Sequence, residues 1–227
     1  MCLPIRKFAF GLALMAALAP AQGQFQPDRE DLAVPYRFSD AERWVPVFED
    51  PARAEWQMTG KLMDALGVEP GMSTADIGAG SGYITRPLAR AVGERGRVFA
   101  VDIELSLLTA LMRRAEAEGL DNIVPTFAAP HAPRLQAECC DLVLFSTSYH
   151  MIAERVDYVA RLAPMLKPGG RIAVLSWRKE ITGDGPPVEY RLDGQAIREE
   201  FRQAGFERVA EFGFLPQQLL QIFAPVP

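Results

Sequence analysis

The chain has 227 residues, of which 49% are hydrophobic and 23% are charged, which suits a single globular domain with a sizeable core. Lysine and arginine number 24 against 29 aspartate and glutamate residues, so the net charge is −5 and no basic excess points to a nucleic acid partner. No set of four ligands has the spacing of a structural zinc site, and we expect no metal.

The first residues predict export. Arg6 and Lys7 precede the apolar run FAFGLALMAALAPA, which is too short for a membrane span of about 20 residues. A basic start followed by a short apolar stretch and small residues is typical of a secretory signal peptide, although an anchor helix or a misassigned start would give a similar pattern. We expect residues 1–23 to be the signal, cut after Ala21 or Gly23, which leaves a periplasmic or secreted protein with no stable membrane span.

Residues 24–67 are expected to form an N-terminal arm and lid helices. The segment 39–42 (SDAE) has the spacing of a capping box and predicts a short helix beginning inside it. The aspartate–proline pair at 50–51 is a second start signal, and this helix is expected to run to Leu66 and to end at Gly67.

Strands alternate with helices over residues 68–227, which is typical of βαβ units and a parallel sheet with right-handed crossovers. Adjacent Cys139 and Cys140 rarely pair without strain, so we expect buried thiols, with a redox or metal pair as the alternative. The expected strands are 73–77, 97–101, 122–127, 141–146 and 171–176, the expected helices are 83–92, 105–117, 152–166 and 194–204, and 206–215 and 218–223 are expected to pair antiparallel.

One stretch combines a strand, a carboxylate and a glycine turn. Residues 72–83 read MSTADIGAGSGY, and a strand that passes through glycines into a helix exposes backbone N–H groups where a ligand can approach closely. The glycine spacing is one residue short of the dinucleotide fingerprint G-x-G-x-x-G. Asp76 would repel a pyrophosphate and attract a positive group, by about 1 to 4 kcal/mol at a separation of about 4 Å. The turn therefore favours a nucleoside that carries an ammonium group.

Asp102 lies 20 residues after Gly82, at the end of the second expected strand. A carboxylate at this place in an open α/β sheet can accept hydrogen bonds from both hydroxyls of a ribose. A solvated strand end is the alternative for Asp102 taken alone.

These motifs carry a resemblance to a known family. The segments DIGAGSGY, VDI, DLVL and LKPGGR resemble the successive motifs of class I S-adenosylmethionine-dependent methyltransferases, over roughly residues 68–224. The stretch 47–82 and the segment 185–189 (GPPVE) also resemble an exported bacterial subgroup of methyltransferase-domain proteins. The resemblance implies a three-layer Rossmann-like sandwich with a seven-stranded, mostly parallel sheet of order 3-2-1-4-5-7-6, an antiparallel strand 7, and N-terminal lid helices.

The resemblance also implies a cofactor, S-adenosylmethionine, and the residues that bind it. His131 stands where the family usually carries an acid that takes the adenine amino group, so its ring or a backbone carbonyl is expected to substitute, with an exposed loop histidine as the alternative. The expected cofactor-binding residues are Asp76, Gly78, Ala79, Gly80, Gly82, Tyr83, Asp102, Ile103, His131 and Ser146.

Methyl transfer from a sulfonium is a direct displacement, so alignment and water exclusion matter more than a dedicated catalytic group. If the acceptor is protonated, His150 is the candidate base, since its unperturbed pKa of about 6.5 suits proton transfer near neutral pH. Tyr149 is the candidate to position the acceptor, and a structural role is the alternative for both. Three aromatic residues, Trp44, Phe48 and Trp56, are interpreted as core side chains or as the lining of an apolar acceptor pocket.

The expected function is methyl transfer to a small-molecule acceptor. A non-catalytic module that binds a nucleoside or related metabolite is the alternative, because S-adenosylmethionine is made in the cytosol and the expected location is outside it. A nucleotide-dependent oxidoreductase is disfavoured by Asp76 and by the glycine spacing. The sequence indicates no oligomeric state.

Overall fold

The structure is a computed structural model that describes residues 33, 37–181 and 185–226. The expected signal peptide and most of the expected arm lie outside these residues. Among the described residues, none of the helices has both the length and the apolar character that crossing a membrane requires.

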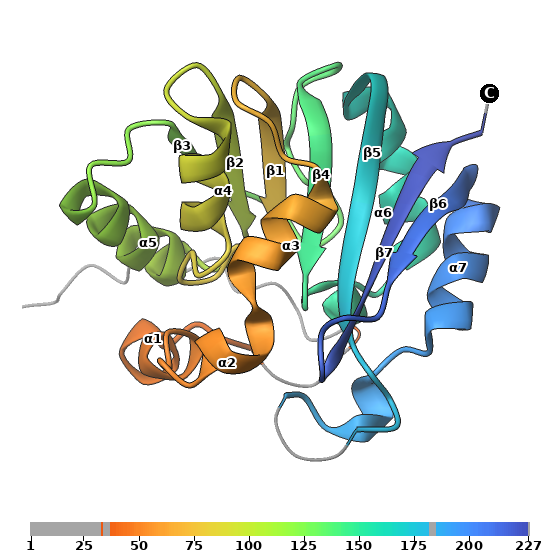
Figure 1. Cartoon of the computed structure of the whole chain (residues 1–227), viewed down its shortest axis with the longest axis horizontal. Coiled ribbons are helices and arrows are strands. Elements are labelled where there is room, and N and C mark those ends of the chain that lie inside the picture. Colours follow the sequence, from red (N-terminus) through yellow and green to blue (C-terminus); the bar gives the residue numbers. More distant parts are fainter. Residues whose placement is uncertain (1–32, 34–36, 182–184, 227) are drawn as a thin grey trace, which may run out of the picture.

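Seven strands form one sheet of order β3-β2-β1-β4-β5-β7-β6, as predicted (Figure 1). The first five run parallel to their neighbours, and β7 runs antiparallel to both β5 and β6. The strands are β1 (Ser73–Ile77), β2 (Arg97–Asp102), β3 (Ile123–Phe127), β4 (Cys140–Ser146), β5 (Leu166–Trp177), β6 (Phe206–Phe212) and β7 (Gln218–Pro225).

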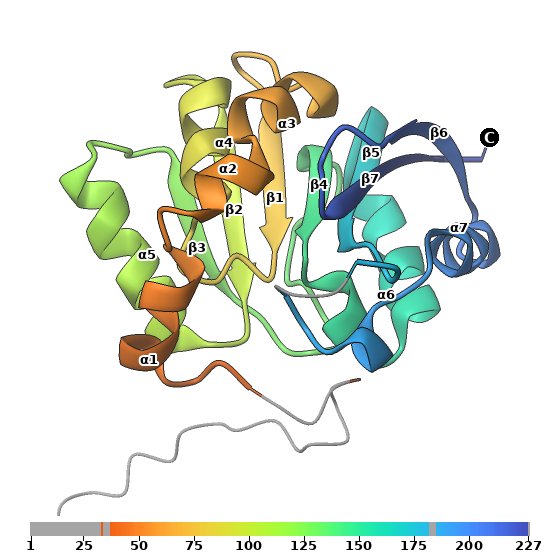
Figure 2. The same cartoon turned by 60° about the horizontal axis from the view of Figure 1, so that its bottom comes forward.

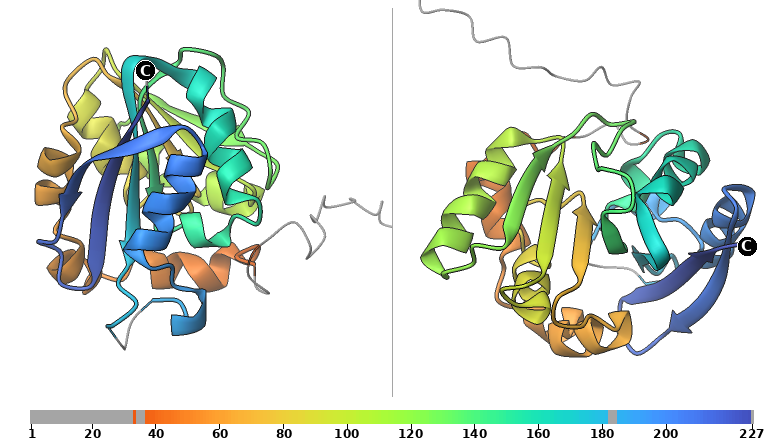
Figure 3. Two further views of the ribbon diagram at one scale, coloured as in Figure 1. Left: turned by 90° about the vertical axis from the view of Figure 1, so that its right-hand side faces the viewer. Right: turned by 90° about the horizontal axis from the view of Figure 1, so that it is seen from above.

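Helices cover both faces of the sheet, which confirms the three-layer sandwich (Figure 3). Helices α3, α4 and α5 pack on one face, and α6 and α7 pack on the other. The helices are α1 (Ala41–Phe48), α2 (Arg53–Gln57), α3 (Thr59–Leu66), α4 (Thr85–Val92), α5 (Leu105–Ala117), α6 (Arg155–Leu162) and α7 (Gly194–Gln203), with 3₁₀ turns at Tyr149–Met151, Ala163–Met165 and Val188–Tyr190.

Strand β4 shows how the sequence builds this core. Leu142 and Leu144 join the cluster under α3–α5, while Val143 and Phe145 join the cluster under α6 and α7. Successive side chains of a strand point to opposite faces, so an uninterrupted apolar run is the pattern expected of a strand covered on both sides.

Two predicted helix boundaries are wrong. The helix expected from 50–51 to Leu66 is broken at Met58, whose φ of 44° ends α2 and begins α3. Next to the break, the buried Gln57 carboxamide donates to Gln218 Oε1 of β7 at 2.9 Å, a tertiary bond that a local helix pattern does not reveal. The helix expected at 152–166 is shorter, because its last part is a 3₁₀ turn and β5 already begins at Leu166.

The caps of the N-terminal helices also differ in detail. Asp40 caps α1, since its carboxylate accepts the backbone N–H of Arg43 at 3.2 Å, whereas the predicted box began one residue earlier. Gly67 ends α3 in the left-handed region, as predicted.

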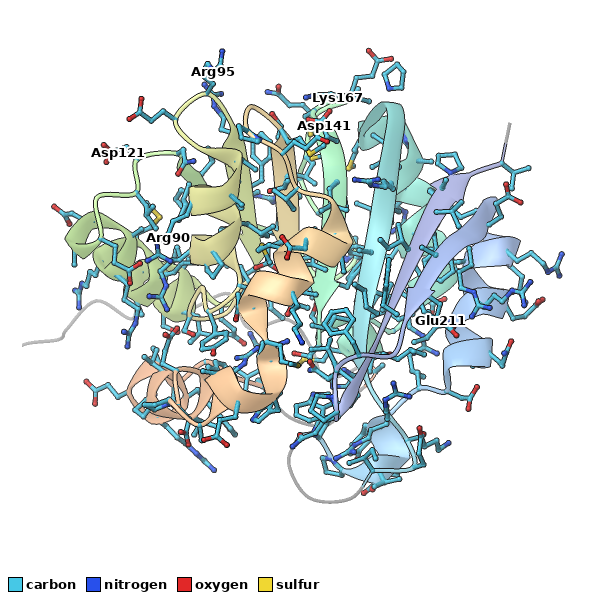
Figure 4. All side chains as sticks on the ribbon, viewed as in Figure 1. Arg90, Arg95, Asp121, Asp141, Lys167 and Glu211 are labelled. Atoms are coloured by element: carbon cyan, nitrogen blue, oxygen red, sulfur yellow. The ribbon has the colours of Figure 1, made fainter. Side chains whose placement is uncertain are left out.

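The amino ends of β1, β4 and β5 are tied together at one edge of the sheet (Figure 4). Asp141 Oδ2 accepts the Ser73 backbone N–H at 2.7 Å and the Lys167 ammonium at 2.6 Å. The neighbouring Cys140 is buried in the core as a free thiol, 3.3 Å from the Cys139 sulfur. In open α/β sheets ligands bind at the opposite end, beyond the carboxyl ends of the strands.

Candidate functional site

A cavity of about 630 Å³ lies at the carboxyl edge of the sheet. It is enclosed by the ends of β1, β2, β4 and β5 and by helices α1 and α2, which lie below this edge in Figure 1 and come forward in Figure 2. Cavities of 300 to 1,000 Å³ are typical of small-molecule sites. Of the residues singled out from the sequence, Asp76, Gly78, Ala79, Gly80, Tyr83, Asp102, Ile103, Ser146 and His150 line it.

The glycine turn forms the floor of the cavity and is held by backbone bonds. The N–H groups of Gly78 and Ala79 donate to the Val101 carbonyl at 2.8 and 3.1 Å. At Gly78, φ is 74° and an added Cβ would lie 2.5 Å from the Cβ of Ser148, so only glycine fits there. The turn therefore joins the ends of β1, β2 and β4 and keeps bare backbone next to the cavity.

Asp76 is a buried carboxylate, and only one of its two oxygens accepts a hydrogen bond within the described part of the chain. Its Oδ2 accepts the Thr85 hydroxyl at 2.7 Å, while Oδ1 is buried and has no hydrogen-bond partner within the described part of the chain. Burial raises the pKa of Asp76 to about 6, and nearby Asp102 adds to the rise against the Thr85 hydrogen bond. Because a buried acceptor without a partner is costly, this oxygen indicates a donor, preferably a cation, on the ligand.

Asp102 organises the turn as well as facing the cavity. Its Oδ2 accepts the Gly80 N–H at 2.7 Å and its Oδ1 accepts the Glu104 N–H at 2.8 Å. Burial raises its pKa to about 6 against these two backbone hydrogen bonds. A carboxylate has about four acceptor positions, so two remain for ligand hydroxyls.

Aromatic side chains from the chain's N-terminal part cover the glycine turn. The rings of Phe38, Trp44 and Phe48 pack together with centroid separations of 4.8 to 5.9 Å. A Cβ added at Gly80 would lie 3.7 Å from the Phe48 ring. The three rings therefore form an apolar roof that limits water at this end of the cavity.

The Glu49 carboxylate connects the aromatic roof to the glycine turn. Glu49, directly after α1, accepts the Ser81 hydroxyl at 2.6 Å and forms an ion pair with Arg86 of α4. On the other side, Arg37 donates to Glu104 at 2.8 and 3.0 Å. Sequence reasoning missed these contacts, because each partner is an ordinary surface-type residue until the fold brings the two together.

Arg53 is the main residue that the sequence reading missed. Its guanidinium lines the cavity, lies 4.0 Å from the Tyr83 ring centroid, and donates to Gln57 Oε1 and to the Phe48 carbonyl, both at 3.0 Å. Burial lowers its pKa, although Tyr83, Glu49 and Asp76 oppose that shift. The cavity thus holds a guanidinium as well as the Asp76 carboxylate.

The other end of the cavity lies beyond β4. Thr147 has φ = 60°, which is strained for a β-branched residue, and its N–H donates to the Leu175 carbonyl at 2.8 Å. His150 lines the cavity beside it, and burial followed by the charges of Arg155 and Arg191 lowers its pKa to about 4. At neutral pH the imidazole is therefore uncharged, and its unprotonated nitrogen is a hydrogen-bond acceptor.

The low pKa of His150 gives a first prediction. Its imidazole resonances should titrate near pH 4, and a midpoint near pH 6.5 in an NMR titration would contradict the burial argument. Because the folded pKa lies below the unfolded one, the stabilisation that neutral His150 gives is complete above about pH 6.5 and is lost as the pH falls towards 4. A His150→Asn variant should lack this part of the acid destabilisation.

Three sequence-predicted site residues are not among the residues that line the large cavity. Tyr149 is buried under α7, where its hydroxyl donates to Glu200 Oε2 at 2.8 Å, so this geometry favours the structural role, and the residue lines only a small adjoining cavity. Gly82 packs against α5, since an added Cβ would lie 2.6 Å from Leu111 Cγ. The side chain of His131 is exposed, and its carbonyl accepts a bond from Arg161 at 2.6 Å.

His131 was expected to contact the adenine. The cavity there is lined instead by the three residues that precede it, Ala128, Ala129 and Pro130. Ser146 does line the cavity, and its Oγ has no hydrogen-bond partner among the described residues. No cluster of three or more side chains suited to hold a metal ion occurs in the described ranges. That the lining residues contact a ligand stays a prediction.

Comparisons with known proteins match part of this chain. Residues 75–170 match the family model described as "Methyltransferase domain". The nocamycin O-methyltransferase of Saccharothrix syringae is 30% identical over 131 residues, 58% of this chain and 44% of that protein. The aklanonic acid methyltransferase DauC of Streptomyces sp. (strain C5) is 34% identical over 119 residues, 52% of this chain and 54% of that protein. The chain thus spans about half the length of these curated relatives.

Solved structures share the fold over a larger part of the chain. A SAM-dependent methyltransferase from Aquifex aeolicus superposes with a TM-score of 0.78 at 23% identity, covering 84% of this chain and 100% of that chain. A type 11 methyltransferase from Sulfolobus solfataricus, described as putative, gives a TM-score of 0.60 at 22% identity, covering 74% of this chain and 91% of that chain. At these identities the likeness shows the fold.

Proposed function

We propose that this chain, which carries a class I methyltransferase domain at residues 75–170, transfers a methyl group from S-adenosylmethionine to a small-molecule acceptor. S-adenosylmethionine is the methyl donor of the family. One observation carries the proposal: the buried Asp76 presents an unpartnered oxygen at a glycine turn beside a cavity of about 630 Å³. The names of matched relatives, an O-methyltransferase and the ubiquinone/menaquinone C-methyltransferases among them, support a small-molecule acceptor.

The cavity residues fit the parts of this cofactor. Asp76 would hold the ammonium group and Arg53 the carboxylate of the methionine part, each by opposite charge. Asp102 would accept hydrogen bonds from the ribose hydroxyls, and the apolar wall of Ile103 and Pro130 would pack against the base. When bound, the sulfonium supplies a methyl group that is already activated for displacement.

The chain's own contribution is alignment and water exclusion. The glycine turn and the rings of Trp44 and Phe48 enclose one end of the cavity, and His150 lies at the other end, where an acceptor would enter. Holding two reactants in line can supply about 7 to 11 kcal/mol of a barrier. This is why we assign no obligatory catalytic residue apart from a base for protonated acceptors.

Arg53 gives a prediction that separates the two parts of the cofactor. Arg53→Leu should weaken S-adenosylhomocysteine binding about tenfold or more, because a charge-assisted hydrogen bond is worth about 1.5 to 3 kcal/mol. Its affinity for methylthioadenosine, which lacks the amino acid part, should stay unchanged. Calorimetry with both ligands measures this, and Arg113→Leu, whose side chain is exposed on α5 and does not line the cavity, is the matched control. Equal losses for both ligands would show that Arg53 does not contact the carboxylate.

Calorimetry with S-adenosylmethionine, S-adenosylhomocysteine and NAD tests the function itself. We expect both sulfur compounds to bind and NAD not to bind. Failure of both sulfur compounds to bind would refute the proposal. Binding without methyl transfer to any acceptor in a broad panel would instead support the non-catalytic module.

We also propose that the chain is exported and belongs with the exported methyltransferase-domain subgroup. The basic and apolar pattern of residues 1–23 supports this, and those residues lie outside the described structure. The protein recovered from fractionated cells of the source organism should begin near residue 22 or 24. A full-length N-terminus in the cytosolic fraction would refute export.

A further inference from the structure

The end of the cavity away from the glycine turn has a separate lining. Thr147, His150, Trp177 and Pro186 line both the main cavity and a small adjoining one of about 10 Å³, which places them together at this end. Trp56 of α2 closes the group, with its ring centroid 5.0 Å from that of Trp177 and the two planes inclined by 47°. We call this group of five residues the indole end.

Planar apolar surfaces dominate the indole end. Two indoles and the prolines Pro186 and Pro187 face the cavity there. At Gly185, where φ is 89°, an added Cβ would lie 2.6 Å from the Trp177 indole, so the glycine lets the loop lie flat on that ring. Flat rings and prolines favour a planar ligand by stacking and edge contacts.

Two arginines lie behind the indole end, and each already binds other groups of the protein. The Arg191 guanidinium donates to the Pro186 carbonyl at 2.9 Å and to the Arg178 carbonyl at 3.1 Å, and it lies 5.5 Å from the Trp177 ring centroid. Arg155 forms a bidentate ion pair with the Glu200 carboxylate. Both arginines therefore stabilise the scaffold, and Thr147 and His150 are the polar residues of the indole end that line the cavity.

We propose that the indole end binds a planar aromatic acceptor that carries a hydroxyl group, with its ring against Trp56 and Trp177 and its hydroxyl at His150. The inference rests on the proposed function and specifies its substrate class. In the transfer, the acceptor oxygen forms a bond to the methyl carbon while the methyl–sulfur bond breaks and its electron pair stays on sulfur. The acceptor hydroxyl donates a hydrogen bond to the neutral imidazole of His150, which orients the oxygen towards the methyl group, and the hydroxyl proton is released to solvent as the oxygen is methylated.

Binding of three matched probes tests both parts of the proposal. The probes are 2-naphthol, decahydro-2-naphthol, which keeps the skeleton and the hydroxyl but is not planar, and naphthalene, which keeps the ring but lacks the hydroxyl. With the full chain saturated by S-adenosylhomocysteine, equilibrium dialysis should show 2-naphthol binding at least tenfold more tightly than either of the other two.

Two variants assign these preferences to residues. Trp56→Leu should remove the preference for 2-naphthol over decahydro-2-naphthol, and His150→Ala should remove the preference for 2-naphthol over naphthalene. Each variant should keep its affinity for S-adenosylhomocysteine. Trp44→Leu is the matched control on the roof over the glycine turn, and it should weaken S-adenosylhomocysteine while leaving both preferences intact.

The outcomes separate this inference from the function on which it rests. If S-adenosylhomocysteine binds but decahydro-2-naphthol binds as well as 2-naphthol, or if the preference survives in Trp56→Leu, the aromatic acceptor is refuted. If the wild type binds naphthalene as tightly as 2-naphthol, the hydroxyl contact is refuted. It is also refuted if His150→Ala keeps the preference for 2-naphthol over naphthalene. If S-adenosylhomocysteine itself does not bind, the proposed function fails instead.

Discussion

Replacing Asp76 with asparagine should make the ligand-free protein more stable and weaken its binding of S-adenosylmethionine. The carboxylate is fully buried, its pKa is raised to about 6, and its Oδ1 has no partner within the described residues. Asparagine keeps an acceptor for the Thr85 hydroxyl and has no charge to bury. A rise in pKa from 3.8 to about 6 corresponds to about 3 kcal/mol at pH 7, and we expect a gain of about 1 to 3 kcal/mol.

The sign of the pH dependence makes this prediction specific. Because the folded pKa of Asp76 lies above the unfolded one, its ionisation costs stability as the pH rises through about 6. The advantage of Asp76→Asn should therefore be complete above pH 6 and vanish below about pH 4. Denaturant unfolding at pH 4 and pH 7 measures it.

Asp141→Asn is the matched control for Asp76→Asn. Asp141 lies at the opposite edge of the sheet, where its Oδ2 accepts from Lys167 and from the Ser73 N–H, so that variant should lose stability at pH 7. On the binding side, loss of the Asp76 charge should lower the affinity for S-adenosylmethionine by about 1 to 4 kcal/mol, measured by calorimetry. An Asp76→Asn protein that is less stable at pH 7, or that binds normally, would contradict the role given to Asp76.

Gly82→Ala should destabilise the fold by about 3 kcal/mol or more. At this position φ is 87°, and an added Cβ would lie 2.6 Å from Leu111 Cγ in the interior of α5. Both the backbone strain and the overlap in a close-packed core raise the free energy of the folded state. Thermal or denaturant unfolding measures the loss.

Gly93→Ala is the control that isolates backbone strain. There φ is 64° and ψ is −174°, a region that glycine alone normally adopts, but nothing lies within 4 Å of an added Cβ, so the expected cost is backbone strain alone, about 1 to 3 kcal/mol. The combination of Gly82→Ala with Leu111→Ala should cost less than the sum of the two single changes, because the second change removes the atoms that overlap. Equal costs at Gly82 and Gly93 would show that the packing against α5 is not limiting.

The parts of the fold that sequence patterns predicted well are those with local causes. Strand β1 and helix α5 begin and end where predicted, because a glycine or a turn marks each boundary within a few residues. The sheet order required the family resemblance, since the pattern of strands alone does not specify which strands are neighbours.

The candidate site was predicted in part for the same reason. Asp76 and Asp102 stand at strand ends, so their place at the carboxyl edge follows from the alternation of strands and helices. Tyr149 and His150 are adjacent in a 3₁₀ turn, where neighbouring side chains point in different directions, and only the fold shows which one faces the cavity. Arg53 and Glu49 acquire their roles through partners 30 or more residues away.

Glu49 affects how fast a ligand exchanges. Its carboxylate joins the end of α1 to Ser81 and Arg86, and α1 and α2 cover the cavity, so a ligand that passes beneath α1 breaks these contacts on the way in and on the way out. A contact that is present before and after binding raises the barrier in both directions and leaves the equilibrium unchanged. For a ligand that takes this route, we expect Glu49 to affect the residence time and Asp76 to affect the affinity, so the two quantities should respond to different substitutions.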